Sequence, residues 1–349
     1  MMLREFRPSD GPEVVRELSL NFAEENALTG MDASHFLRVV EKAYHGALGT
    51  LLKLSRLFGI PPVLFLVAEE DHRLVGTTFV SFQGGLGYLA MVMTDPDHRR
   101  RGVASALLDR AELACRRRGR RYSVLDVMED NLAAQRLYRG RGYERLRRVE
   151  GWVRPLPAGS LGPPAAGPVR ATLPSDVPFL VEAHREAMPP RVREVLPAGV
   201  SSLLPRRWLD RVLLSESSAW CTGPPSRPTA YARGTFTTPR EPGLLSLPYL
   251  AEGIAPEESE GLLSVALTWL SQRGADRVAV TVPEYERRTS AFLQGHGFSL
   301  RWRTDTLVKD LRRRNPSVTL PSDPGIDKRT TPVSVSGGTR PSLPNPPGA

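Results

Sequence analysis

A short basic loop that contains glycine has the composition of a phosphate-binding site. It reads Arg-Arg-Arg-Gly-Val-Ala and follows an apolar stretch that ends at Thr94. An amphipathic pattern after it predicts a helix from about Ala104 to Arg118. The first N–H groups of a helix lack backbone partners and carry partial positive charge, so a diphosphate can bind there. We therefore expect an anion site made by Arg99, Arg100, Arg101, Gly102, Val103 and Ala104.

A second motif lies about thirty residues further along the chain. Asn131 precedes a helical pattern that carries Tyr138 and ends at Gly142-Tyr143, and an alternating stretch, 122–127, predicts a strand before it. Asn131 is a suitable N-cap because its side chain can accept a hydrogen bond from the first helical turn. A single tyrosine on such a helix is by itself most often a core aromatic.

Together the two motifs resemble the GNAT (GCN5-related N-acetyltransferase) superfamily. Arg99-x-x-Gly102-x-Ala104 matches the family's acyl-CoA pyrophosphate loop, which reads Gln or Arg, two residues, Gly, one residue, then Gly or Ala. The segment from Asn131 to Tyr143 is similar to the family's fourth helix and the strand after it. The resemblance implies that Tyr138 points at the thioester and serves as the general acid for the departing thiolate.

The resemblance also implies where the pantetheine arm binds. In the family, two neighbouring strands splay apart and the arm pairs with one of them as if a strand had been added. The matching strand here is 86–94, and Met91, Val92 and Met93 match the pairing positions. With the basic loop and Asn131, these three residues complete the predicted acetyl-CoA site.

The general base is less well defined, because many relatives carry a glutamate on the strand that matches 86–93 and no carboxylate occurs there. Asp126, near the end of the following strand, is our first candidate, although alternation leaves open that it faces solvent. Glu129 and Asp130 in the next loop are further candidates. An acidic group near the expected acceptor site could attract a cationic amine and comprises Glu24, Glu25 and Asp32.

The elements that position these residues occur twice. A shift of 155 residues places Leu107-Leu108 on Leu262-Leu263 and Gly142-Tyr143 on Gly297-Phe298, which indicates an internal duplication. We expect an α/β protein of two tandem GNAT folds, each a mixed, mostly antiparallel sheet flanked by helices. The predicted parts are an acetyl-CoA-binding, catalytic domain (1–154), a Pro/Gly-rich linker (155–168), a degenerate GNAT-like domain (169–310) and a disordered, basic, Pro-rich tail (311–349).

The second copy lacks the residues to which the resemblance assigns chemistry. The same shift places Gly102 on Glu257 and Tyr138 on Leu293. A glutamate at the loop repels a diphosphate, and a leucine has no proton to donate. We expect the second copy either to support the first structurally or to complete its acceptor site. Arg99, Ala104 and Asn131 fall on Ile254, Ser259 and Glu286.

Composition excludes several other classes. The net charge is +9, of which residues 311–349 contribute +4, so nucleic-acid binding through the tail is a minor alternative. Cys115 and Cys221 show no ligand-like spacing, and we expect no metal. No stretch approaches a membrane span and the N-terminus lacks the apolar core of a signal peptide, so we expect a cytoplasmic protein with no membrane partner.

The function predicted from these observations is transfer of an acetyl group from acetyl-CoA, as co-substrate, to a primary amine by direct attack in a ternary complex. The acceptor amine is unidentified. A monomer is favoured over a homodimer, because two fused copies can replace a dimer. The alternative is a non-catalytic acyl-CoA-binding or protein-interaction module, which the missing carboxylate on 86–93 supports.

Overall fold

The computed structural model describes residues 1–21, 63–156, 168–196 and 214–312. Most of the predicted linker and nearly all of the predicted tail, together with Glu24, Glu25 and Asp32, lie outside these residues. Within the described part of the chain, no helix has both the length and the apolar character that crossing a membrane requires.

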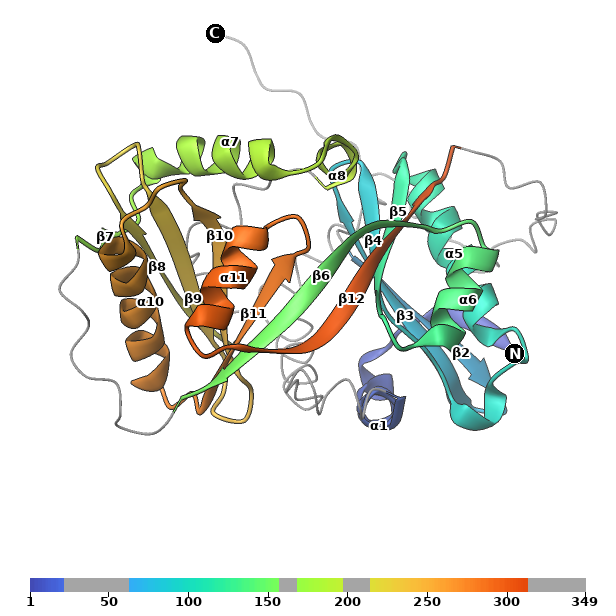
Figure 1. The fold of residues 1–349 in the computed structure, drawn as a ribbon. Helices are drawn as coiled ribbons and strands as arrows, with labels where there is room; N and C mark the ends of the chain where they lie inside the picture. The colour runs from blue at the N-terminus through green and yellow to red at the C-terminus, as the bar shows by residue number, and fades with distance from the viewer. Residues whose placement is uncertain (22–62, 157–167, 197–213, 313–349) are drawn as a thin grey trace, which may run out of the picture. The chain divides into compact units, whose positions relative to one another are not determined.

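The described elements of the first half are a strand and a helix, then three strands, and finally helix, strand, helix and strand (Figure 1). Its elements are β1 (Met2–Glu5), α1 (Gly11–Asn21), β2 (Val63–Glu70), β3 (Arg73–Gln83), β4 (Leu86–Thr94), α5 (Val103–Arg117), β5 (Tyr122–Met128), α6 (Leu132–Gly140) and β6 (Glu144–Pro155). Short 3₁₀ turns at Pro8–Asp10 and Pro96–His98 precede α1 and the basic loop.

The second half repeats this order. It comprises β7 (Arg170–Ala171), a 3₁₀ turn at Pro174–Asp176, α7 (Val177–Ala187), α8 (Pro190–Val195), β8 (Glu216–Thr222), β9 (Ala230–Phe236), β10 (Gly243–Leu250), α10 (Pro256–Ser271), β11 (Arg277–Pro283), α11 (Arg287–Gly295) and β12 (Ser299–Asp310). A shift of 155 residues carries the bounds of β5, α6 and β6 onto those of β11, α11 and β12. Both fold repeats are therefore present, as the sequence predicted.

The opening of each half uses the same side-chain pair. Arg4 donates two hydrogen bonds to Asp10, at 2.7 and 3.0 Å, and Arg170 donates two to Asp176, at 2.7 and 2.9 Å. Each aspartate also accepts a bond from the backbone N–H three residues before it. The pair fixes the turn from the first strand into the first helix in both halves.

The described strands form one continuous sheet in which the halves exchange their last strands. The order is β1-β2-β3-β4-β5-β12-β6-β11-β10-β9-β8-β7. β12 pairs antiparallel with β5 of the first half, and β6 pairs antiparallel with β11 of the second. β6 and β12 also pair with each other at the centre, where they cross in Figure 1. Each half therefore contains one strand supplied by the other.

The exchanged strand contributes to the apolar core of the first half. Leu307 and Leu311 pack with the α5 residues Leu107 and Leu108 against β4 and β5. Lys309 of β12 forms a buried ion pair with Glu112 of α5 at 2.8 Å. A second core, around α10 and α11, includes Trp152 of β6. Both cores depend on residues from both halves.

Candidate active site

A gap opens between β4 and β5 at the centre of the first half. The two strands pair in parallel only from Leu86 to Leu89 of β4, opposite Tyr122 to Leu125 of β5. Beyond that point β4 continues along β3, whereas β5 continues along β12. The backbone of β4 after Leu89 thus has no ladder partner on its β5 side among the described strands.

Met91 marks an irregularity in the pairing of β4 with β3. Its φ angle is +51°, in the left-handed region that non-glycine residues seldom adopt, and the β3–β4 register shifts between Ala90 and Met93. The predicted pantetheine-binding positions, Met91, Val92 and Met93, therefore lie along the gap. At this irregularity, Met91 and Val92 have no paired residue on β3.

The basic loop lies at the N-terminus of α5, as the sequence predicted. Gly102 is the N-cap, and its φ of +85° is a conformation that favours glycine. Apart from the residues next to it in the chain, no described atom comes within 4 Å of the position that a Cβ on Gly102 would occupy. The first turn of α5 carries no acidic residue. The side chain of Val103, the first residue of α5, is buried in the core of the first half. The N–H groups of the first helical turn therefore lie at the end of the basic loop.

The loop is tied to α1. Arg99 donates a hydrogen bond from Nη2 to Oδ1 of Asn21 at 3.0 Å, and Asn21 donates one to the buried Glu17 at 3.2 Å. Asp95 accepts hydrogen bonds from the backbone of Asp97 and from His98. These contacts hold the turn that leads into Arg99, while Arg100 and Arg101 are exposed.

Asn131 lies at the start of α6, as the sequence predicted, and Tyr138 lies on the same helix. Asn131 caps α6 by accepting a hydrogen bond from the backbone of Ala134 at 3.1 Å. Tyr138 is 5% exposed and packs edge-on against Tyr143, with ring centroids 6.0 Å apart. Both tyrosines belong to the core between the sheet and the helices α5 and α6.

Asp126 lies on the opposite face of the sheet from Tyr138. Its carboxylate is exposed and accepts a hydrogen bond from the hydroxyl of Tyr88 at 2.5 Å. Tyr88 packs with Tyr122 and Val124, and both burial and the Asp126 carboxylate raise the pKa of Tyr88 above its usual value.

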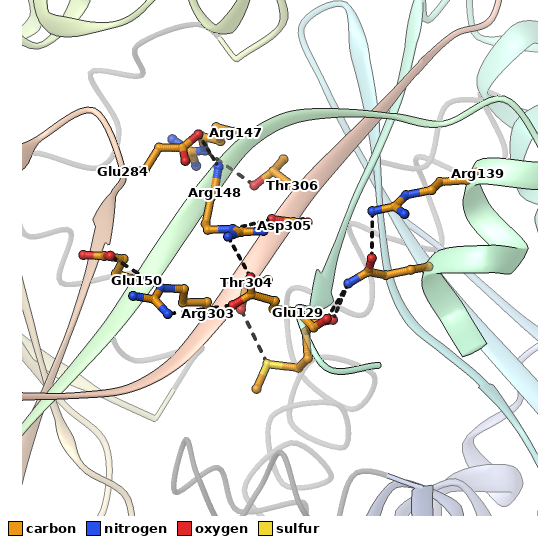
Figure 2. Close-up of polar contacts among 12 residues, drawn as sticks. Glu129, Arg139, Arg147, Arg148, Glu150, Glu284, Arg303, Thr304, Asp305 and Thr306 are labelled. Atoms are coloured by element: carbon orange, nitrogen blue, oxygen red, sulfur yellow. Dashed lines mark hydrogen bonds and ion pairs between the residues drawn. The ribbon is translucent and has the colours of Figure 1, made fainter. Parts of the chain in front are cut away.

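The other base candidates differ in their surroundings. Glu129 forms an ion pair with Arg148 at 2.7 Å, and Arg148 also binds the buried Asp305 at 2.9 Å (Figure 2). Arg303 approaches the same glutamate at 4.0 Å. Glu129 is therefore paired with two arginines. Asp130 lies in an exposed turn.

The N-terminus of α10 in the second half differs from that of α5. Its N-cap is Ala255, proline follows, and Glu257 and Glu258 occupy the first turn. Two carboxylates there oppose binding of a diphosphate. β10 and β11 nevertheless repeat the splay, because they pair only from Gly243 to Leu245. The described part of the chain contains no cluster of three or more side chains suited to hold a metal ion.

The sequence did not identify Tyr88 as part of the site. Its contact with Asp126 depends on the parallel register of β4 and β5, which places Tyr88 opposite Val124, two residues before Asp126 on the same face. The sequence left open that Asp126 faces solvent, and its side chain is exposed in the structure. The strand register was the missing information.

A gap between splayed strands and a glycine-capped helix end together define the architecture of an acyl-CoA-binding fold. Comparison with known proteins agrees: residues 35–143 match the acetyltransferase (GNAT) family model. The chain belongs to the GNAT superfamily.

Curated relatives match parts of the chain. Acetyl transferase GW6a of Oryza sativa subsp. japonica is 37% identical over 169 residues, which are 43% of this chain and 40% of that protein. An acetyltransferase of Pectobacterium atrosepticum is 36% identical over 93 residues, 27% of this chain and 66% of that protein. The chain thus spans about two fifths of the rice protein and just under two thirds of the bacterial one.

Solved structures match nearly the whole chain in fold. A tandem GNAT protein from the clavulanic acid biosynthesis pathway aligns with a TM-score of 0.60 at 15% identity, covering 92% of this chain and 99% of that chain. A GCN5-related N-acetyltransferase from Sphaerobacter thermophilus aligns with a TM-score of 0.56 at 16% identity, covering 91% and 97%. At these identities the likeness shows the tandem fold alone.

Proposed function

We propose that the first half transfers an acetyl group from acetyl-CoA to a primary amine by direct attack in a ternary complex. The observation that carries the proposal is the gap beside Met91, which leads to the glycine-capped N-terminus of α5. Homologues named acetyltransferases support acyl transfer in general. The acceptor and the acyl donor are parts of the proposal.

The residues present fit acetyl-CoA as the donor. The first N–H groups of α5 and the exposed guanidinium groups of Arg100 and Arg101 can bind the diphosphate. The free backbone edge of β4 can pair with the pantetheine amides. Acetyl-CoA supplies an acetyl group activated as a thioester.

The two proton transfers are assigned to residues on opposite faces of the sheet. As the amine nitrogen bonds to the acetyl carbonyl carbon, the bond from that carbon to sulfur breaks. Tyr138 gives its hydroxyl proton to the departing sulfur, and Asp126 accepts the proton that the amine loses, directly or through a water molecule. The hydrogen bond from Tyr88 holds the Asp126 carboxylate in place.

Calorimetric titration with acetyl-CoA tests donor binding. We expect one site per chain, abolished in Gly102→Glu, because a carboxylate at this helix end repels the diphosphate. Gly253→Glu is the matched control: Gly253 also has a positive φ and open space, and it precedes α10, where no binding is proposed. Absence of heat with the unmodified chain, or loss of binding in both variants, would contradict the proposal.

Tyr138→Phe, measured in the same preparations, tests the assigned acid. Acetyl-CoA affinity should stay unchanged while kcat falls by about 100-fold or more, because only proton donation is lost. Binding without turnover of any amine by the unmodified chain would instead support the non-catalytic acyl-CoA-binding module. We also propose that the protein is cytoplasmic and monomeric and that it has no nucleic-acid partner.

A further inference from the structure

A row of polar side chains crosses one face of the sheet from the first half into the second. Thr306 of β12 pairs with Asp126 of β5 on one side and with Arg147 of β6 on the other. Tyr88 of β4 extends the row through its hydrogen bond to Asp126. The row therefore runs from the proposed base, Asp126, to β6. This strand belongs to the first half by sequence and pairs with β11 of the second half.

Arg147 is the one cation of this row, and it has no carboxylate partner within ion-pair distance among the described residues. Its hydrogen bonds go to two hydroxyl groups, Oγ1 of Thr306 at 3.5 Å and that of Tyr285 at 3.4 Å. The neighbouring Arg148, on the other face, binds two carboxylates (Figure 2). A guanidinium group has five N–H donors, so the half-buried Arg147 keeps donors for a further acceptor.

The second half adds three side chains beside Arg147. Tyr285 and Glu286 follow β11, and His184 comes from α7. Nδ1 of His184 and Oε1 of Glu286 are 3.9 Å apart, and both atoms are buried without a hydrogen-bond partner. The side chain of Glu286 is 10% exposed. Buried polar atoms are seldom left unpaired, so these two indicate a place for a bound polar group.

Capping of its own helix does not explain why the carboxyl group of Glu286 is buried. It holds the N-cap position of α11 but makes no cap hydrogen bond, whereas Asn131, at the equivalent position of α6, makes one. Burial raises the pKa of Glu286 to about 7, opposed by the positive charge of Arg147. A carboxyl group that is partly protonated near neutral pH can donate a hydrogen bond to an anion.

We propose that the acceptor is an amine that also carries an anionic group, and that Arg147 binds this group beside Tyr285 and Glu286. This inference rests on the proposed acetyl transfer. Asp126 and Arg147 are separated by β12, so about two strand spacings, roughly 10 Å, lie between them. The amine then reaches the gap near Asp126 while its anion lies on Arg147. The second half thereby supplies part of the acceptor site.

The charges favour an anion over a second cation. A cationic group would be repelled by Arg147, and it would require Glu286 to be ionised. An anion instead pairs with the guanidinium group and accepts from the Tyr285 hydroxyl and the protonated Glu286. His184 lies 3.9 Å from Glu286, and burial lowers the pKa of His184, which keeps this imidazole neutral.

The test measures thiol release from acetyl-CoA with amines of matched length. The series comprises ω-amino carboxylates of two to eight carbons, ω-aminoalkyl phosphates, simple alkylamines and α,ω-diamines. We expect kcat/KM for the best anionic amine to exceed that of the alkylamine of equal length by about 10- to 100-fold, the range for charge-assisted hydrogen bonds. The carboxylate and phosphate arms show which anion is preferred.

Variants test whether Arg147 causes the preference for the anionic amine. Arg147→Met should remove the advantage of the anionic amine through KM, with little change for the alkylamine. Arg145→Met is the control, because Arg145 is an exposed arginine of the same strand. Glu286→Gln should keep the preference, since an amide still donates to an anion. Should Arg147→Met prove unfolded by circular dichroism, Arg147→Lys takes its place, with a smaller loss expected because lysine cannot bind in the same fork geometry.

The outcomes separate the two proposals. Acetylation of alkylamines or diamines in preference to anionic amines overturns this inference and leaves acetyl transfer standing. An anion preference that Glu286→Gln abolishes, or that Arg147→Met leaves intact, overturns the assignment to Arg147. No acetyl-CoA binding in calorimetry overturns the proposed function itself, and the inference with it.

Discussion

At the scale of single residues, the two arginine–aspartate pairs show how both halves begin in the same way. Asp176 is fully buried and accepts hydrogen bonds from Arg170 and from the backbone N–H groups of Leu173 and Ser226. The hydrogen bond from Arg170, with the two backbone bonds, outweighs burial and holds the pKa of Asp176 below its usual value. This carboxylate therefore contributes stability only while it is ionised.

Asp176→Asn should lower the free energy of unfolding by about 3 kcal/mol at pH 7, because it removes the carboxylate that pairs with the Arg170 guanidinium. A lowered folded-state pKa gives stability that is complete above the unfolded value of about 4 and is lost as the pH falls through the folded value. The difference between the two proteins should therefore shrink below about pH 4. Urea unfolding at pH 7 and pH 3 measures both quantities.

Asp276→Asn provides the control for this prediction. Asp276 pairs with Arg277 at 2.8 Å, but its side chain is 64% exposed. An exposed pair contributes at most about 1 kcal/mol. An equal loss in both variants, or a difference for Asp176→Asn that does not depend on pH, would contradict the role given to the buried pair.

At the scale of elements, the exchanged strands pair with each other at a position that excludes a side chain. Gly151 of β6 pairs with Trp302 of β12, and a Cβ on Gly151 would lie 1.9 Å from the Trp302 ring. The indole ring covers the glycine in place of a neighbouring side chain. The pairing of β6 with β12 at this point thus depends on one glycine.

Gly151→Ala should destabilise the protein by about 1–3 kcal/mol, because either the indole or the strands must move. Thermal unfolding followed by circular dichroism measures the change. In the control, Gly295→Ala, no atom lies within 4 Å of the added methyl group, at the end of α11. Alanine should be neutral there or stabilise by up to about 1 kcal/mol. A Gly151→Ala protein as stable as the control would show that the crossing tolerates a side chain.

The sequence predicted most elements within one or two residues, but not the exchange of strands. The predicted strand over 86–94 matches β4, and the predicted helix from about Ala104 to Arg118 matches α5 within one residue. β6 and β12 are equivalent under the duplication, so each suits the place beside β5 or beside β11. Alternation identifies which face a strand buries but not which copy it pairs with. Arg147 was missed for the same reason, since its neighbours come from the exchanged strand.

At the scale of the whole molecule, shared strands should make the two halves unfold together. All five tryptophans lie at or after Trp152, so their fluorescence reports on the second half and the crossing strands. Far-ultraviolet circular dichroism reports on both halves. We expect the two urea transitions to coincide, because neither core keeps its full set of strands once the other is lost. A dichroism transition that precedes the fluorescence change would show that the halves unfold separately.

The exchange also fixes the order in which the chain becomes complete during synthesis. β6 ends at Pro155 and β12 ends at Asp310, so 155 further residues must be made before the first half receives its missing strand. At about 5–20 residues per second, this delay is roughly 10–30 s. Throughout that time the nascent chain exposes the β12-facing edges of β5 and β6, at which two neighbouring nascent chains on one messenger RNA can pair with each other. Closer spacing of ribosomes on the messenger RNA should therefore lower the yield of correctly paired protein, because neighbouring chains can pair before β12 emerges.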